Sequence, residues 1–271
     1  MFEARDWLER ARDLINEAFA RRDHALRREE QMATPAPSTQ SVHLELLTNY
    51  LVSMARSVEM NVDRALTAIL QIGSSGRRQS PSEIFLMEPR VNEMEIVIDE
   101  HAVRMLRAGD LSSEEIRQVV ATLKITNDLE RMGDLAVNLA ERILSLSEMP
   151  AVAAPPELEP MVTAVRAMIK KSLGALIFKN VVLAGEVLES DDLVDRYRDE
   201  IFERLLEGMR KSPGDVAPNL QLVLASRYLE RLADHATNIA EDIIFWVRGL
   251  DVRHGRVANL NAQTAPFTEN S

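Results

Sequence analysis

Carboxylates spaced four residues apart recur in four places along the chain, and this is the sequence pattern most suited to chemistry. The pairs are Glu95 with Asp99, Glu130 with Asp134, Asp195 with Asp199, and Glu230 with Asp234. On a helix, residues four apart share a face, with Cβ atoms about 5–6 Å from each other, and like charges there repel mildly. Oxygen ligands without thiolates suit hard cations such as iron(III), manganese, magnesium and calcium. The pairs therefore predict a metal site, with more than one ion where four or more acids converge.

Other oxygen-bearing side chains extend the pairs at 130 and 230 into stripes. With about 100° between successive helical residues, the groups around Glu130 fall within about 80° of arc, and the apolar face lies opposite. The second stripe repeats the first, except that Arg227 stands where the first has Asn127. We expect these flanking groups to support the metal ligands: Asn127, Asn138, Glu141, Arg227, Asn238 and Glu241. The other two pairs are preceded, three residues earlier, by Asn92 and Asp192.

A metal-free acidic surface is the alternative explanation. Charged residues opposite an apolar stripe are ordinary on a surface helix, and a single Glu-x-x-x-Asp is usually solvated. An ordinary exposed face, however, mixes signs to gain ion pairs four residues apart. Neither stripe contains a lysine, and the acidic pairs recur at duplicated positions. These two observations favour metal binding over a solvated face.

Catalysis is not indicated. The sequence has no cysteine, no phosphate-binding glycine loop and no nucleophile elbow. None of the five histidines follows a glutamate by three residues, as the Glu-x-x-His of ferritin-like di-iron enzymes requires. His101 and His235 are single histidines that we predict to be structural or solvated. A carboxylate-metal enzyme, such as a phosphatase or an oxygen-activating protein, stays an alternative that lacks a candidate base.

The elements that position these residues are predicted to be helices. Long stretches rich in Ala, Leu, Glu and Arg, with only ten glycines in 271 residues, favour an all-α fold. Clusters of proline and small residues mark the breaks between elements. The sequence predicts helices at 2–32, 42–71, 84–108, 113–148, 157–188, 191–211 and 218–248, followed by a flexible tail from Gly249.

An internal repeat organises these helices. LERMGDLAVNLAERIL at 129–144 and LERLADHATNIAEDII at 229–244 are identical at nine of sixteen positions without a gap. Two copies at this long period indicate a domain duplication rather than a solenoid. We therefore predict two tandem three-helix bundles, each with its own acidic stripe. The expected domains are an N-terminal helix and Pro-rich linker at 1–40, the first repeat at 41–148, a linker at 149–156, the second repeat at 157–248, and the tail at 249–271.

Composition excludes several partners. The net charge is -11, from 32 Lys and Arg against 43 Asp and Glu, so a nucleic-acid footprint is not expected. The longest apolar stretches are far shorter than the roughly 18 residues that suggest a membrane span. Charges in the first ten residues argue against a signal peptide, and the absence of cysteine fits a reducing compartment. We expect a cytoplasmic protein that does not insert into membranes.

The two stripe motifs also resemble a known family. NDLERMGDLAVNLAE at 127–141, RYLERLADHATNIAED at 227–242 and GLDVRH at 249–254 are similar to the paired signatures of the PhoU family, accessory regulators of bacterial phosphate uptake. The resemblance spans roughly 42–254. Two features depart from the family pattern: the extension at 1–40 and the GSSGRRQ insertion at 73–79.

The resemblance carries several expectations. It implies six core helices in two similar bundles and multinuclear metal clusters, of iron or zinc, held by the four acidic pairs at 95/99, 130/134, 195/199 and 230/234; manganese or magnesium are alternatives. It implies a cytoplasmic, commonly dimeric protein that couples the phosphate ABC transporter to the sensor histidine kinase of the phosphate response. Such a protein represses that response when phosphate is plentiful.

Overall fold

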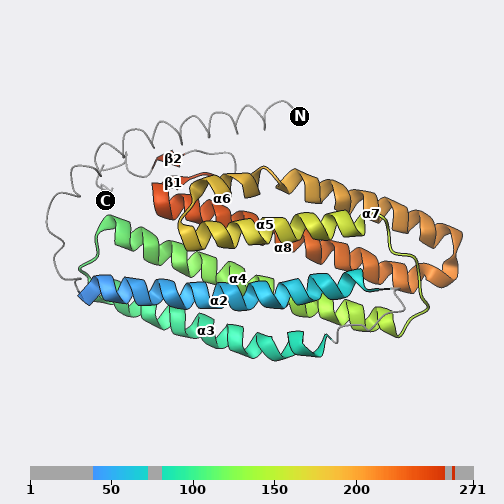
Figure 1. Ribbon diagram of the computed structural model, residues 1–271, viewed down its shortest axis with the longest axis horizontal. Helices are drawn as coiled ribbons and strands as arrows, with labels where there is room; N and C mark the ends of the chain where they lie inside the picture. The colour runs from blue at the N-terminus through green and yellow to red at the C-terminus, as the bar shows by residue number, and fades with distance from the viewer. Residues whose placement is uncertain (1–38, 73–80, 254–257, 260–271) are drawn as a thin grey trace, which may run out of the picture.

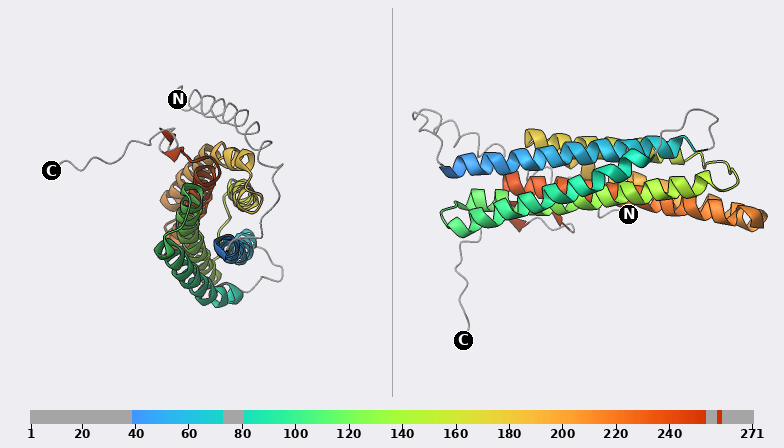
Figure 2. Two further views of the ribbon diagram at one scale, coloured as in Figure 1. Left: turned by 90° about the vertical axis from the view of Figure 1, so that its left-hand side faces the viewer. Right: turned by 90° about the horizontal axis from the view of Figure 1, so that it is seen from below.

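The computed structural model describes residues 39–72, 81–253 and 258–259, which form an elongated, almost wholly helical molecule (Figures 1 and 2). The predicted helix at 2–32 and the insertion at 73–79 lie outside the described residues. The described helices are α2 (Thr39–Leu70), α3 (Ser82–Ala108), α4 (Ser113–Ser147), α5 (Leu158–Phe178), α6 (Val181–Leu188), α7 (Asp191–Lys211) and α8 (Val216–Arg248), with a short 3₁₀ turn at Pro213–Asp215. The all-α fold class is confirmed.

Local sequence explains where the helices begin and end. Ser112 and Glu115 form a reciprocal capping box that starts α4, in which each side chain accepts the other residue's backbone N–H. α3 and α8 end at Gly109 and Gly249, both in the left-handed conformation that glycine adopts without strain. These signals, together with the apolar periodicity, place most helix ends within a few residues of the predicted bounds.

The predicted helix at 157–188 is wrong as a single element. The chain leaves the helical conformation at Lys179, which has a φ of 49°, and restarts as α6. The side chain of Asn180 accepts hydrogen bonds from the backbone N–H groups of Val182 and Leu183, at 2.9 and 3.3 Å. An N-terminal cap of this kind favours a new helix start over continuation. The first helix of the second repeat is therefore α5 followed by α6.

The two repeats form two three-helix bundles that share one core. The first contains α2, α3 and α4, and the second contains α5 with α6, α7 and α8 (Figure 1). Duplicated positions such as Leu129 and Leu229, or Met132 and Leu232, are fully buried in a single continuous apolar cluster. α4 and α8, the helices with the repeated motifs, lie side by side at the centre of the molecule.

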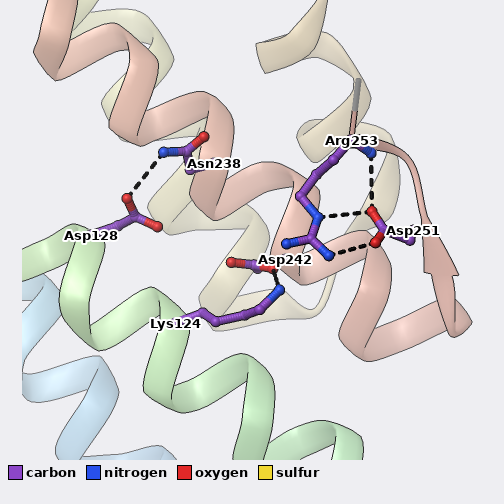
Figure 3. Close-up of polar contacts among 6 residues, drawn as sticks. All are labelled: Lys124, Asp128, Asn238, Asp242, Asp251 and Arg253. Carbon is purple, nitrogen blue, oxygen red and sulfur yellow. Dashed lines mark hydrogen bonds and ion pairs between the residues drawn. The ribbon is translucent and has the colours of Figure 1, made fainter. Parts of the chain in front are cut away.

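Polar contacts between α4 and α8 fix their antiparallel register. The Lys124 ammonium lies 2.8 Å from Asp242, while further along α4 Arg142 donates to Gln221 at 3.1 Å. Between these two contacts, the carboxylate of Asp128 lies 2.7 Å from the His235 ring and accepts a hydrogen bond from Asn238 at 3.1 Å. Figure 3 shows the bond from Asn238 to Asp128. We call these contacts the polar seam. His235 is thus structural, as predicted.

The start of the C-terminal tail is ordered, which corrects the prediction of flexibility from Gly249. Leu250–Asp251 (β1) pairs with Ala258–Asn259 (β2) in a short antiparallel ladder. Leu250 and Val252 are buried against the helices, and Arg253 forms an ion pair with Asp251 at 2.5 Å (Figure 3). The Arg253 guanidinium holds the pKa of Asp251 down, at about 2. No described helix is long and apolar enough to span a membrane.

Candidate metal centre

The acidic pairs of the first repeat lie on the two adjacent helices α3 and α4. Glu95 and Asp99 are on α3, and Glu130 and Asp134 are on α4. Burial raises the pKa of Glu95, and the nearby negative charges of Asp99 and Asp134 raise it further. Burial also raises the pKa of Glu130. The negative charges of Asp134 and Glu95 raise it further, and Asp134 lies close enough to share a hydrogen bond with Glu130. The four carboxylates therefore share one electrostatic site. We use the name first stripe for these four acids alone, without the flanking residues.

Little positive charge balances the first stripe. Arg131 approaches Glu130 at 3.6 Å, but the Arg131 side chain is 55% exposed. An exposed pair of this kind contributes little, because water screens it. Position 98, between the two acids of α3, is a fully buried isoleucine. The first stripe is therefore a set of oxygen donors with excess negative charge, which suits a hard cation.

The second repeat contains a cation of its own. Arg198 of α7 lies among the second-repeat acids, with its guanidinium 3.0 Å from Glu230, 3.1 Å from Asp199 and 3.8 Å from Asp195. Its side chain is only 23% exposed, so the contacts are less screened than those of Arg131. Ile98 occupies the equivalent position of the first repeat. We call the acids Asp195, Asp199, Glu230 and Asp234 the second stripe; Arg198 neutralises part of it.

Another acid, Asp191, also joins the second stripe. Burial raises the pKa of Asp191, as do Asp195 and other nearby carboxylates, and its side chain accepts a hydrogen bond from Thr237 at 3.3 Å. Burial and the charges of Asp191 and Glu230 raise the pKa of Asp234 to about 6. Sequence reasoning named Asp192 rather than Asp191, and it missed Arg198. Both were visible as departures from the repeat, since the first copy has Val91 and Ile98 at these positions.

The flanking residues predicted to support the ligands lie in varied surroundings. Asn127 and Arg227 are exposed, and Asn138 is half-buried. Glu141 forms an ion pair with the neighbouring Arg142 at 3.1 Å. Asn238 belongs to the polar seam through Asp128. Glu241 lies toward the C-terminal end of α8, where burial and Asp242 raise its pKa to about 7.

The carboxylates are not preassembled around a single point. Within residues 39–72, 81–253 and 258–259, no three carboxylate or imidazole groups converge closely enough to hold an ion as they are placed. A cation at the first stripe would have to draw Glu95, Glu130 and Asp134 together by side-chain rotation. The donor chemistry and the excess charge fit a hard metal at the first stripe, whereas Arg198 competes with one at the second.

The fold and the acidic faces define a class of protein: a tandem duplication of a three-helix bundle in which the repeats share a core and carry acidic stripes on matching helices. The family model for the PhoU domain matches the chain twice, at residues 51–143 and 158–243. These two matches cover more than half of the chain, which therefore belongs to the PhoU family.

Individual relatives agree with this assignment. The chain is 32% identical over 224 residues to a Pseudomonas putida protein and 34% identical over 215 residues to one from Pseudomonas aeruginosa. Both relatives are named phosphate-specific transport system accessory protein PhoU homologues. The alignments cover 82% and 79% of this chain, and 86% and 87% of the relatives.

Solved structures show the same architecture. The crystal structure of PhoU from Pseudomonas aeruginosa superposes with a TM-score of 0.71 at 30% identity, covering 77% of this chain and 98% of that one. The phosphate transport system regulatory protein PhoU from Streptococcus pneumoniae shares the fold, with a TM-score of 0.68 at 21% identity, over 79% of this chain and 99% of that one.

The contrast between the two stripes predicts unequal effects of their arginines on stability. Arg198→Ile, which installs the residue of the first repeat, leaves Glu230 largely buried beside other acids without its cation. We expect a loss of about 1–3 kcal/mol in the free energy of unfolding. Urea denaturation at neutral pH with a chelator present measures it. The matched control Arg131→Ile is expected to cost less than about 1 kcal/mol, because Arg131 is exposed; equal losses would show that Arg198 has no special role.

The raised pKa of Glu241 predicts a pH-dependent effect on stability. Asp242, Asp251 and Asp191 face this carboxyl along with the opposing Arg253, and its folded pKa of about 7 exceeds the ordinary value of 4.5. The folded state therefore holds a proton that the unfolded state releases, so this group's contribution to stability declines as the pH rises from about 4.5 to 7. Glu241→Gln should raise the melting temperature at pH 8 and change it little at pH 4. A gain that is the same at both pH values would rule out this titration.

Proposed function

We propose that this protein is a cytoplasmic regulator of phosphate uptake and of the phosphate-starvation response. It would act as an adaptor between the phosphate ABC transporter and the sensor histidine kinase, and repress the response when phosphate is plentiful. Family membership carries this proposal, since the Pseudomonas relatives are named accessory proteins of the phosphate-specific transport system and align over most of the chain. We further propose that it works as a homo-oligomer, most simply a homodimer.

A non-enzymatic role fits the described residues. A hydrolytic or redox centre needs open coordination positions together with a base or acid within hydrogen-bond reach of a reacting atom. The half-buried His235, next to Asp234 in the sequence, contacts Asp128 in the polar seam. The charged groups that act on Glu95 and Glu130 are the other carboxylates of the first stripe and the exposed Arg131. An adaptor whose acidic faces are stabilised by cations accounts for these residues without a reaction.

We propose that metal binds first and most tightly at the first stripe. Glu95, Glu130 and Asp134 supply oxygen ligands there, with Asp99 at the edge of the site. The supporting observation is that burial and the neighbouring acids raise the pKa values of Glu95 and Glu130 across α3 and α4, where the described arginine beside them, Arg131, is exposed. A bound cation would neutralise the stripe and hold α3 against α4. Iron or zinc is our expectation for the metal from family resemblance, with manganese or magnesium as alternatives; a multinuclear cluster would engage all four acids.

Elemental analysis tests the metal proposal. The full chain, purified without a histidine tag or chelator, is expected to carry at least about one ion per chain. Glu130→Ala/Asp134→Ala should remove most of it and abolish the rise in melting temperature on adding metal, because a ligand that binds only the folded state raises apparent stability. The matched variant Glu230→Ala/Asp234→Ala should retain most of the metal. Less than about one ion per chain, unchanged by the first variant, would contradict metal binding.

Gene deletion tests the regulatory proposal separately. Loss of the gene should switch on phosphate-starvation genes in medium rich in phosphate, since the repressor of the response is gone. Transcript levels of those genes measure the effect, and the full-length gene supplied in trans should reverse it. If starvation genes stay silent in the deletion strain, the proposed regulatory role is wrong, whatever the metal content of the protein.

A further inference from the structure

A cavity of about 240 Å³ lies at one end of the first bundle. It is bounded by the beginning of α2, the end of α3 and the connection to α4, and its described lining residues are His43, His101, Arg104, Met105, Ala108 and Leu111. Ligand pockets for drug-sized molecules begin at about 300 Å³. At about 240 Å³ the cavity is smaller than this, so it suits an organic molecule smaller than a drug.

The titratable groups described around this cavity are all bases. His43, His101 and Arg104 converge there in a chain whose net charge is -11. His101 and Arg104 lie three residues apart on α3, and His43 lies on α2, so both helices contribute a base to the lining. Arg104 is 4.0 Å from the carboxylate of Glu100 in an exposed pair, and its Nε donates to the backbone carbonyl of Glu100 at 3.1 Å. An anion in the cavity would lie close to the Arg104 guanidinium and to both imidazoles.

The rest of the lining is apolar. Met105 is buried in the last turn of α3, and Ala108 and Leu111 also line the cavity. The ring of His101 is held against Tyr50, with 5.2 Å between the ring centroids. A concave apolar site with a few fixed polar groups is the usual form of a small-molecule site. These residues fit an anion that has an apolar body.

The second repeat shows what a purely structural version of this corner looks like. Its equivalent of Arg104 is Arg204. The Nε of Arg204 donates to both carboxylate oxygens of Glu157, at 3.1 Å to Oε1 and 2.9 Å to Oε2. Its equivalent of His101 is Ile201, which is fully buried. In the first repeat, the only described carboxylate near Arg104 is Glu100 on the same helix. The first repeat thus differs by placing an exposed arginine and an imidazole in the lining of a cavity.

We propose that this cavity, which we call the α2–α3 pocket, binds a small organic anion that has one phosphate or carboxylate group on an apolar body. Arg104 supplies the charge-assisted hydrogen bonds to the oxyanion, and the imidazoles of His101 and His43 add N–H donors. Met105, Ala108 and Leu111 contact the apolar part. The site is independent of metal at the stripes, so it stands even if no cation binds there.

Titration of the full chain with phenyl phosphate, followed by the histidine ring signals in NMR, tests the proposal. The signals of His101 and His43, assigned with His101→Gln and His43→Gln, should shift at pH 7, while that of His235 in the polar seam should not. Protein treated with chelator should bind equally well, which separates this site from the metal proposal.

Matched probes and variants distinguish the parts of the site. Arg104→Gln should weaken binding at least about tenfold, since a charge-assisted hydrogen bond is lost. Arg107→Gln, on the same exposed helix end but outside the pocket lining, should leave it unchanged. Benzoate tests a carboxylate in place of the phosphate, inorganic phosphate tests the anion alone, and phenol tests the apolar body alone.

Weaker binding of both inorganic phosphate and phenol than of phenyl phosphate supports the proposal. It would be overturned by the absence of any histidine shift up to about 10 mM phenyl phosphate. Equal weakening by Arg104→Gln and Arg107→Gln would also overturn it, because binding would then reflect general positive charge. Equal affinity for phenol and phenyl phosphate would show that the pocket does not recognise an anion.

Discussion

The packing of α4 against α8 is the constraint on which the rest of the structure depends. Each of these helices buries one face in the common apolar core and leaves another for the acids, so their rotation determines where both stripes lie. Apolar packing alone would tolerate a shift along the helix axis. The polar seam does not, because Asp242, Asp128 and His235 have little exposure to water and are paired with Lys124 or with each other. A shift of one turn would leave these groups buried without partners, which is costly.

The duplication places equivalent carboxylates in two sites, but the chain balances their charge in two ways. In the second repeat, Arg198 reaches Glu230 from α7 and offsets part of the repulsion permanently. In the first, a buried isoleucine stands at the matching position. Burial, and after it repulsion between the acids, raises the pKa values of Glu95 and Glu130, and the exposed Arg131 offsets only part of this rise. The same divergence occurs at the bundle ends, where Arg204 is paired with Glu157 and Arg104 faces a cavity. Differences between the copies, more than their similarities, locate the sites where a ligand would help.

Much of the fold was predictable because it follows from periodicity and repetition. The apolar spacing around Leu129 and its repeat at Leu229 identify the helices, and the gap-free match identifies the duplication. The break at Lys179 was harder to predict, since the apolar pattern runs through it and only Asn180 signals a new cap. The paired strands after Gly249 depend on residues brought together by the folded helices. Arg198 illustrates a further limit: a helical wheel assigns it to the flank of α7, whereas its long side chain reaches across to α8.

The central claim is that the acids of the first repeat lack an internal cation and therefore take one from solution, whereas those of the second are partly satisfied by Arg198. Anomalous X-ray scattering from crystals of the full chain grown with manganese tests it most directly. The account predicts a strong anomalous peak between α3 and α4, in contact with Glu95, Glu130 and Asp134, and a weaker peak or none between α7 and α8. A peak confined to α7 and α8, or no peak at either stripe with manganese in excess, would contradict it.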